Sequence, residues 1–416
     1  MTDPVEPVRI VRLAAGGDGV GHLPDGRAVF VPRSAPGELV ELRQLRVHRR
    51  FARARLGALV EPSASRVVPP CPHYTVDDCG GCQLQHLNDA AQRAARAMFV
   101  GDALRRIARL DAPDPELVPA DRVFGYRTKL TLHVAAGGRR IGLHPVGRPD
   151  QVFELDWCHI TDDALNRLWQ AVRRERTRLP PALVQVVLRL DRRGGRHLLL
   201  AGGGAEAWTG GPALGAALAR RGADAIVWWE PEGGAPRVVA GGDEVYPATI
   251  FEQVHPAMGD LVRAHALAQA GAVAGRLVWD LYAGLGETTE QLLALGADVD
   301  SVEVDRRAVT EAVRCGAALG PTRVRRLAGR VEDRLSELRA PAVVVTNPPR
   351  TGMDERVTAA LAAGGAARIV YISCDPATLA RDLTRLAPVY RVAGVRSFDL
   401  FPQTAHVETV AVLERA

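Results

Sequence analysis

The chain of 416 residues is 47% hydrophobic and 24% charged, which is typical of a globular protein with two or three domains. No apolar run approaches the roughly 18 residues of a membrane span, and the first residues lack the basic and apolar segments of a signal peptide, so we expect a cytoplasmic protein. The net charge is +5, and among 53 basic residues only Lys129 is a lysine. Scattered arginines are therefore background, and only their clustering indicates an acidic partner.

Short strands separated by glycine-rich turns are expected near the start of the chain, at 8–13, 28–31 and 38–45. Several short strands in so short a segment favour a small β-barrel. Six arginines then fall between Arg43 and Arg55, a higher density than elsewhere in the chain. They form either a solvated strand face or a strip that contacts an RNA backbone, and Arg49 and Arg50 are the candidate contacts.

Three cysteines, Cys71, Cys79 and Cys82, lie in one turn-rich stretch. Because a cytoplasmic chain does not rely on disulfides and thiolates at short spacing wrap a single centre, we expect these cysteines to bind metal. Cys158, far along the chain, is a candidate fourth ligand. Four thiolates suit either a structural zinc ion or a [4Fe–4S] cluster, and the spacing alone leaves both open.

The middle of the chain begins with a predicted helix at 90–109 and a strand entry at 124–133. Arg127 and Lys129 in this strand are candidate RNA contacts, and the alternative is an ordinary surface pair. From 134 to 245, predicted strands alternate with one helix at 162–176, and no group of residues there indicates catalysis.

From about 246 the pattern changes to alternating strands and helices, which predicts a parallel sheet covered on both faces. A tight turn at Gly284 and Gly286 follows the first of these strands, and Glu303 ends the next strand. A glycine turn followed by an acidic residue binds a nucleoside, and on its own it fits NAD as well as S-adenosylmethionine. The chain ends in a predicted hairpin formed by 392–398 and 407–413.

Cys374 follows the apolar strand 369–372 and precedes Pro376, where a helix is expected to begin. Ligands of open α/β sheets bind at this edge, and a helix N-terminus favours the thiolate over the thiol. Cys374 is therefore a candidate nucleophile. The alternative is a small buried apolar residue.

Several stretches together resemble the RNA uracil-5-methyltransferases, in the order of that family, and they cover nearly the whole chain. The amino-terminal stretch resembles a TRAM domain, and the cysteine stretch resembles the cluster region of the bacterial enzymes that act on 23S rRNA. The stretches are Val11-Arg-Leu-Ala-Ala-Gly-Gly-Asp-Gly-Val-Gly-His22, Cys79-Gly-Gly-Cys-Gln-Leu-Gln-His86, Tyr126-Arg-Thr-Lys129, Ile250-Phe-Glu-Gln-Val-His-Pro256, Asp280-Leu-Tyr-Ala-Gly-Leu-Gly286, Asn347-Pro-Pro-Arg-Thr-Gly352, Tyr371-Ile-Ser-Cys-Asp-Pro-Ala-Thr-Leu-Ala-Arg-Asp382 and Phe401-Pro-Gln-Thr-Ala-His-Val-Glu408.

The resemblance implies an α/β catalytic domain of the class I SAM-methyltransferase type, Rossmann-like and with a C-terminal β-hairpin. It adds an N-terminal TRAM barrel of the OB-like kind and a central α+β iron-sulfur domain. The implied domains are 1–62, 63–245 and 246–416, with the helix at 90–110 packing on the catalytic domain. The implied activity is methylation of carbon 5 of a uridine in structured RNA, most simply 23S rRNA, and no membrane or obligate protein partner is implied.

The same resemblance implies a role for each candidate residue. Cys374 is the nucleophile that adds to carbon 6 of uracil, and Glu408 is the base that removes the carbon 5 proton. S-adenosylmethionine is expected at Gln253, Tyr282, Gly284, Glu303 and Asn347. A [4Fe–4S] cluster is expected at Cys71, Cys79, Cys82 and Cys158, and RNA is expected at Arg127, Lys129, Arg49 and Arg50.

Three features depart from the family pattern. Asn347 stands where an aspartate is usual, Glu287 follows the glycine turn where a small or aromatic residue is usual, and two extra residues separate Cys71 from Cys79. The alternatives are therefore a tRNA uridine-5-methyltransferase and an RNA-binding homologue impaired by Asn347. A radical enzyme is disfavoured, because a fourth thiolate at Cys158 would close the iron site that such chemistry needs open.

Overall fold

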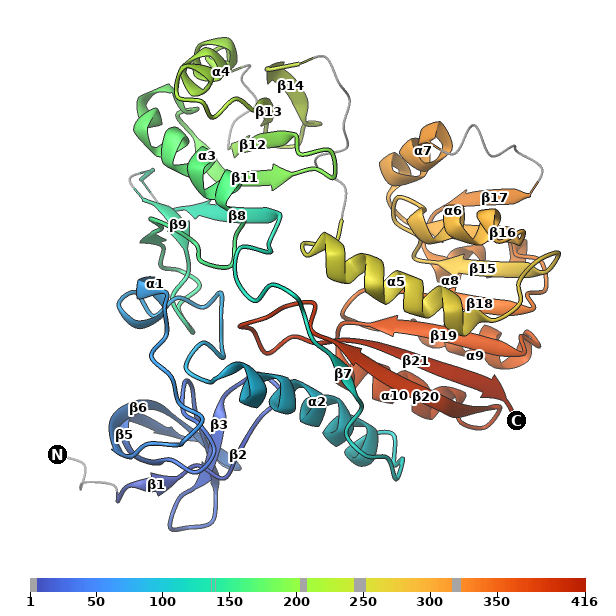
Figure 1. Cartoon of the computed structure of the whole chain (residues 1–416), viewed down its shortest axis with the longest axis horizontal. Coiled ribbons are helices and arrows are strands. Elements are labelled where there is room, and N and C mark those ends of the chain that lie inside the picture. Colours follow the sequence, from blue (N-terminus) through green and yellow to red (C-terminus); the bar gives the residue numbers. More distant parts are fainter. Residues whose placement is uncertain (1–5, 136, 139, 203–207, 243–251, 316–322) are drawn as a thin grey trace. The chain divides into compact units, whose positions relative to one another are not determined.

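The computed structural model describes residues 6–135, 137–138, 140–202, 208–242, 252–315 and 323–416. It separates into two compact units, each treated by itself below (Figure 1). Unit 1 comprises 1–95, 121–248 and 402–405, and unit 2 comprises 96–120, 249–401 and 406–416. The predicted boundary at 245/246 and the start of the 250–256 stretch lie outside the described residues. No described helix is long and apolar enough to cross a membrane.

Unit 1 begins with a six-stranded sheet in the order β1-β5-β6-β4-β3-β2. The strands are β1 (Val8–Arg9), β2 (Arg12–Leu13), β3 (Gly19–His22), β4 (Ala28–Val31), β5 (Leu39–Val47) and β6 (Phe51–Glu61). The two ends of this order, β1 and β2, are successive pieces of one segment, so the sheet closes on itself as the predicted barrel. Its core is aliphatic, with Ile10, Val29 and Val31 fully buried.

A glycine in strand β3 serves the packing of the barrel strands. A Cβ at Gly21 would lie 2.8 Å from the carbonyl oxygen of Arg9 on the neighbouring segment. The chain passes here without room for a side chain, which explains a glycine-rich stretch with no helix behind it.

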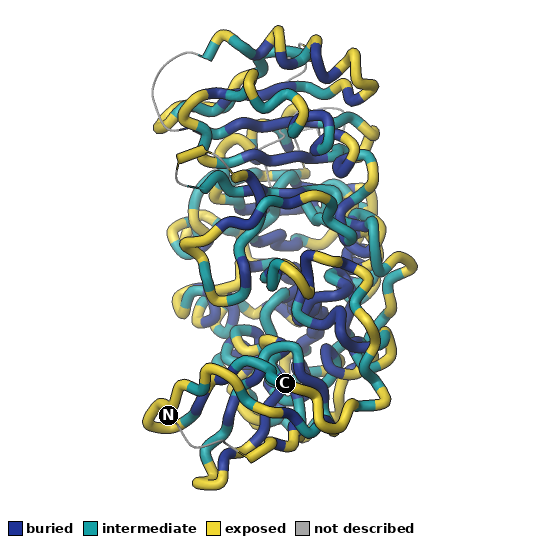
Figure 2. Tube along the Cα trace, turned by 90° about the vertical axis from the view of Figure 1, so that its left-hand side faces the viewer, coloured by how far each residue is buried: buried dark blue, intermediate teal, exposed yellow. Residues whose placement is uncertain are grey.

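A seven-stranded sheet forms the larger part of unit 1, in the order β10-β9-β8-β11-β12-β13-β14. Its strands are β8 (Lys129–Val134), β9 (Ile141–Leu143), β10 (Phe153–Glu154), β11 (Leu183–Leu190), β12 (Arg196–Gly202), β13 (Ile226–Glu230) and β14 (Arg237–Ala240). The helices are α3 (Asp163–Arg174) and α4 (Gly211–Arg220), with a short turn η1 (Arg176–Arg178). One core contains Trp169 of α3, Leu214 of α4 and the strand residue Leu188. Buried residues follow the strands and exposed residues the turns (Figure 2).

The cysteine stretch lies between the barrel and the second sheet in the sequence. It holds the one-turn helix α1 (Pro72–Thr75), and α2 (Asp89–Arg106) follows it. The boundary between the two units falls within α2, after Ala95.

Unit 2 contains an eight-stranded sheet in the order β17-β16-β15-β18-β19-β21-β20-β7. The strands are β7 (Leu117–Val118), β15 (Leu277–Leu281), β16 (Asp298–Glu303), β17 (Val324–Ala328), β18 (Val343–Thr346), β19 (Arg368–Ser373), β20 (Tyr390–Phe398) and β21 (Glu408–Arg415). The five strands from β15 to β19 are parallel, and β21 is antiparallel to both β19 and β20. This is the predicted parallel sheet with a C-terminal hairpin.

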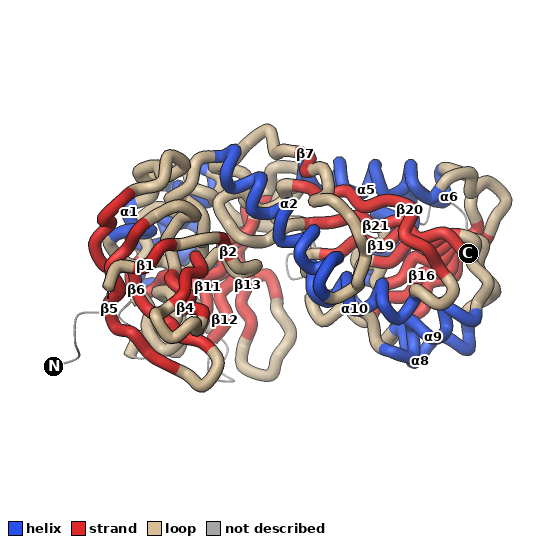
Figure 3. The backbone as a smooth tube through the Cα atoms, turned by 90° about the horizontal axis from the view of Figure 1, so that it is seen from below, coloured by secondary structure: helices blue, strands red, loops and turns tan. Residues whose placement is uncertain are grey.

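Helices cover both faces of this sheet (Figure 3). One core joins α5 and α6 to strand residues such as Val278 and Val370. The other joins the end of α2 with α8, α9 and α10 to residues such as Leu281 and Tyr371. The helices of unit 2 are α5 (Pro256–Ala270), α6 (Glu287–Ala294), α7 (Arg306–Cys315), α8 (Val331–Arg334), α9 (Glu355–Ala363) and α10 (Pro376–Leu386), with a short turn η3 (Leu335–Glu337).

Candidate active site

Cys374 lies between the end of β19 at Ser373 and the N-cap of α10 at Asp375, as predicted, and it is half-buried. The apolar run 369–372 is buried in the sheet, which fixes the end of β19, and Pro376 starts the helix. The nucleophile candidate therefore stands at the carboxyl edge of the parallel strands, where this class of sheet binds its ligands.

Glu408 is the first residue of β21, and the strand register places it beside Cys374. Ser373 pairs with Thr409 across the antiparallel strands, so the next step along each chain brings Cys374 opposite Glu408. Glu408 also pairs with Phe398 of β20, and it is only 2% exposed. Its Oε2 atom has no hydrogen-bond partner within the described part of the chain.

Burial at this edge of the sheet favours the neutral forms of Cys374 and Glu408. Burial raises the pKa of the Glu408 carboxyl to about 8, and the Arg350 guanidinium opposes that rise. Burial also raises the pKa of the Cys374 thiol, the negative charge of Glu408 raises it further, and Arg350 lowers it. The free protein thus holds a thiol beside a carboxyl group that is largely protonated at neutral pH.

The expectation that the helix N-terminus lowers the pKa of Cys374 is wrong for the free protein. The Oδ1 atom of Asp375 accepts hydrogen bonds from Ala377 N at 3.0 Å and Thr378 N at 2.9 Å. The helix end is therefore capped by a carboxylate, and that carboxylate is itself one of the charges that raise the pKa of Cys374.

Arg350 is a site residue that the sequence reasoning missed. It is exposed, and its Nη2 atom lies 3.4 Å from Nε2 of His406. It is the cation that lowers the pKa of both Cys374 and Glu408. The signal was present in the sequence, since Arg350 directly follows the Asn-Pro-Pro of the 347–352 stretch.

The glycine turn and Glu303 come together as predicted. Gly284 has a positive φ of 57°, and its N–H donates to Glu303 Oε2 at 2.8 Å. Glu303 Oε1 accepts from Asp305 N at 2.8 Å. One carboxylate therefore ties the turn after β15 to the end of β16.

Tyr282 and Asn347 lie next to this turn, after neighbouring strands. Asn347 N donates to Leu281 O at 3.2 Å, and Tyr282 has a positive φ of 64°. Burial, followed by nearby acidic charges, raises the pKa of the Tyr282 hydroxyl. Gln253 is separate: it precedes α5 and packs by Gly259, and no hydrogen bond joins it to the other four donor-site candidates in the described residues.

The unusual Glu287 has a structural explanation. It begins α6, and its carboxylate forms an ion pair with Arg263 of α5, whose side chain is 11% exposed. An acidic residue in the first helical turn is favourable, and here it also neutralises a cation that is largely buried.

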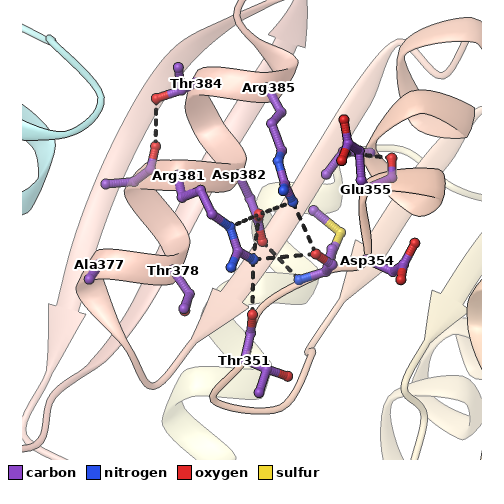
Figure 4. A network of polar contacts seen from close by, with 12 residues as sticks. Thr351, Asp354, Glu355, Ala377, Thr378, Arg381, Asp382, Thr384 and Arg385 are labelled. Carbon is purple, nitrogen blue, oxygen red and sulfur yellow. Dashed lines mark hydrogen bonds and ion pairs between the residues drawn. The ribbon is translucent and has the colours of Figure 1, made fainter.

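A polar network joins the segment after Asn347 to the helix after Cys374 (Figure 4). The fully buried carboxylate of Asp382 accepts from Met353 N and Tyr371 OH, both at 2.8 Å, and from the guanidinium of Arg381. Arg381 also donates to Thr351 O at 2.9 Å. The two segments that carry the donor-site and nucleophile candidates are thereby fixed to each other.

The four predicted metal-binding cysteines line one cavity in unit 1, with a volume of about 130 Å³. Apolar side chains such as Leu130 and Ile160 complete its walls. Burial raises the pKa of Cys71, Cys79 and Cys82, and each of these pKa values is raised further by the charge of Cys158. Among the described residues, no three His, Cys, Asp or Glu side chains lie close enough to hold a single metal ion.

Asp78, in the segment between Cys71 and Cys79, binds arginines of the barrel. Asp78 has a positive φ of 57°. Its carboxylate forms ion pairs with Arg33 at 3.1 Å, with Arg148 at 3.5 Å and with Arg55. Arg33 also donates to Cys79 O at 2.9 Å. Arg55 therefore stabilises the structure, and not every arginine between Arg43 and Arg55 is available to contact RNA.

Arg49 and Arg50 fit the prediction of a contact strip better. Both are exposed in the turn between β5 and β6, and their side chains form no hydrogen bond or ion pair within the described ranges. Arg127 differs, because it lines the cysteine cavity and donates to Lys129 O at 2.8 Å. Burial, then the charges of Arg189 and Arg127, lowers the pKa of Lys129, which is half-buried at the start of β8.

Comparison with known protein families agrees with this arrangement. The profile of the tRNA (uracil-5-)-methyltransferase family matches residues 297–416, and the TRAM domain profile matches residues 5–56. An uncharacterized RNA methyltransferase of Gloeobacter violaceus is 33% identical and is aligned over 99% of both chains. The 23S rRNA (uracil(1939)-C(5))-methyltransferase RlmD of Thiobacillus denitrificans is 32% identical, over 98% of this chain and 99% of that one.

Among solved structures, the fold is similar to that of the Pyrococcus abyssi tRNA (uracil-54, C5)-methyltransferase in complex with S-adenosyl-L-homocysteine. The TM-score is 0.72 at 21% identity, over 98% of this chain and 99% of that one. The sheet order, the barrel and the full-length relatives lead to one conclusion. This chain belongs to the RNA (uracil-5-)-methyltransferase family, with an N-terminal TRAM domain and a class I SAM-dependent methyltransferase fold.

Proposed function

We propose that this enzyme methylates carbon 5 of a uridine in structured RNA, with 23S rRNA as the substrate, through a covalent intermediate on Cys374. The observation that carries the proposal is the strand register that sets Cys374 beside Glu408 at the ligand-binding edge of the sheet. The full-length similarity to the Thiobacillus 23S rRNA enzyme supports the choice of RNA.

The chemistry requires both residues. Carbon 5 of uracil is too weakly nucleophilic to attack a methyl sulfonium, so the Cys374 thiolate first adds to carbon 6 and makes an enolate. Carbon 5 then takes the methyl group, and the bond from sulfur to methyl in the donor breaks. Glu408 removes the proton from carbon 5, and the electron pair that is left re-forms the 5,6 double bond and expels the thiolate.

S-adenosylmethionine is assigned to the carboxyl edge around Gly284 and Glu303. The carboxylate of Glu303 fits ribose hydroxyl groups, and Tyr282 and Asn347 follow the two adjacent strands. Gln253 is kept as a donor contact on the family resemblance alone. Asn347 retains hydrogen-bonding capacity without the charge of the usual aspartate.

We assign a [4Fe–4S] cluster to Cys71, Cys79, Cys82 and Cys158. All four line one cavity with largely apolar walls, which suits four thiolate ligands of one centre. Four thiolates suit a zinc ion as well, and the family resemblance favours the cluster. When bound, the cluster would cross-link the cysteine stretch to the loop between β10 and α3, which carries Cys158.

For RNA we propose contacts at Arg49 and Arg50, which are exposed in a turn of the barrel, and at Arg127 and Lys129. The division into 1–62, 63–245 and 246–416 is proposed as the functional division of the chain, except that residues 96–120 go with the catalytic part because β7 adds to its sheet beside β20.

The test uses unmodified 23S rRNA and unmodified tRNA with labelled methyl donor. Incorporation into 23S rRNA, its loss in Cys374→Ala and trapping of a protein–RNA adduct in Glu408→Gln are expected. Incorporation into tRNA alone would select the second substrate, which the family profile favours. Intact RNA binding with no incorporation into either RNA would instead identify an impaired homologue, with Asn347→Asp as the variant to restore activity.

A further inference from the structure

We propose that Gln403 is a positioning residue that holds the segment carrying Glu408 on the loop that follows Cys82. The segment Pro402–Ala405 connects β20 to β21, yet it clusters with unit 1. Glu408 is the third residue after this segment.

The backbone of Gln403 is bound directly to the cysteine stretch. Its carbonyl oxygen accepts from Gln83 N at 3.2 Å and from Leu84 N at 3.0 Å. Gln83 and Leu84 are the two residues after Cys82, so backbone hydrogen bonds join Gln403 directly to the cysteine stretch.

Gln403 forms a reciprocal pair with Gln92 of α2 through its side-chain oxygen and its backbone N–H. Gln92 Nε2 donates to Gln403 Oε1 at 2.9 Å, and Gln403 N donates to Gln92 Oε1 at 3.2 Å. Both glutamines are 2% exposed. Buried amides of this kind are costly to leave unpaired, so the pair specifies one position for the segment.

Two further hydrogen bonds flank Gln403. Tyr126 OH donates to Pro402 O at 2.9 Å, and Ala405 N donates to Gln83 Oε1 at 3.2 Å. Tyr126 packs in the same small core as Cys71 and Cys82. Gln403 itself has a positive φ of 71°, a conformation that a glutamine rarely adopts and that the surrounding bonds maintain.

A catalytic base needs a fixed position, because proton removal depends on hydrogen-bond distance. Among the described residues, Glu408 has no hydrogen-bond partner at Oε2, so its place depends on the backbone that enters β21. The anchored segment provides that backbone. This inference rests on the proposed role of Glu408 as the base.

The test compares Gln403→Asn with Gln92→Leu. Asparagine tolerates the positive φ but is too short for the amide pair, and leucine removes the pair from the opposite side without altering the segment. The matched control is Gln185→Asn on β11, which makes the same chemical change in the seven-stranded sheet. Hydrogen exchange of peptides covering 402–408 is measured by mass spectrometry, together with protein–RNA adduct during turnover.

Both variants should raise exchange in 402–408 by about tenfold or more, and the double variant should add little to Gln92→Leu, because that change already removes both hydrogen bonds of the pair. Both should also accumulate adduct, as Glu408→Gln does, because methyl transfer precedes proton removal. Unchanged exchange in 402–408, or a lower melting temperature without accumulated adduct, would overturn the anchor. If Glu408→Gln itself accumulates no adduct, the base role fails, and the exchange result alone then decides for or against the anchor.

Discussion

Replacing Glu408 by glutamine should stabilise the protein at alkaline pH and leave its stability unchanged in acid. Burial raises the pKa of this carboxyl from 4.5 to about 8. Below pH 4.5 the group is protonated in both the folded and unfolded states, and its contribution is the same in each. As the pH rises towards 8, the unfolded chain releases the proton while the folded chain retains it, so stability is progressively lost.

The structure sets the size of this effect. At about 1.4 kcal/mol for each tenfold change in proton affinity, the difference between 4.5 and about 8 corresponds to an upper limit of about 5 kcal/mol. The side chain is 2% exposed and its Oε2 atom is unpaired, so solvent screening removes little of it. Glutamine has nearly the same volume and no charge, and it avoids the loss entirely.

The assay is urea unfolding of both proteins between pH 5 and pH 9. The quantity of interest is the difference in unfolding free energy at each pH, because other titrating groups such as Asp280 are common to both proteins. The difference should grow from about 1 kcal/mol at pH 5 to several kcal/mol at pH 8.5. A constant difference across this range would show that Glu408 has an ordinary pKa, and the argument from burial would be wrong.

Three other variants probe the rest of the site. Arg350→Ala removes the cation that lowers the pKa of the Cys374 thiol, so alkylation of the Cys374 peptide at pH 8 should slow by about threefold, and an unchanged rate would exclude this role. Gly352→Ala places a Cβ 2.6 Å from Asp382 Oδ2 at a φ of 74°, so the free energy of urea unfolding should fall by about 2 kcal/mol or more. The control Gly365→Ala has a similar φ but open space around its Cβ, and its unfolding free energy should fall by less. Replacing Arg49 and Arg50 by alanine should lower the salt dependence of RNA binding by a slope of about 1 to 2, and an equal slope would place the contact strip elsewhere.

The sequence could predict the catalytic unit because its signals are local. The apolar run before Cys374 and the proline after it define a strand end and a helix start, and both lie where expected. The hairpin was predicted from the sequence, but the register that sets Glu408 beside Cys374 belongs to the pairing of β19 with β21 and was not predicted. β7 was missed, because a strand of two residues has no periodicity to detect, and its place beside β20 depends on the finished sheet.

Properties that depend on distant parts of the chain could not be predicted. Arg55 belongs to an arginine-rich segment, yet its partner is Asp78 of the cysteine stretch. The anchoring of Gln403 by Gln92 joins residues that are 311 positions apart. Burial and the negative charge of Glu408 raise the pKa of the Cys374 thiol, whereas the helix start alone would lower it.

The protonation state of the free site links Asn347 to the activation of Cys374. A thiolate beside an ionised Glu408 would place two negative charges in a largely buried position, where burial raises the pKa of both groups. In the proposed mechanism, the sulfonium of the methyl donor brings a positive charge to the same edge of the sheet and favours both ionised forms. An aspartate at position 347 would partly neutralise that charge, whereas Asn347 leaves more of it to act on Cys374. The neutral residue would thus weaken donor binding and strengthen nucleophile activation, so the departure from the family pattern is compatible with catalysis.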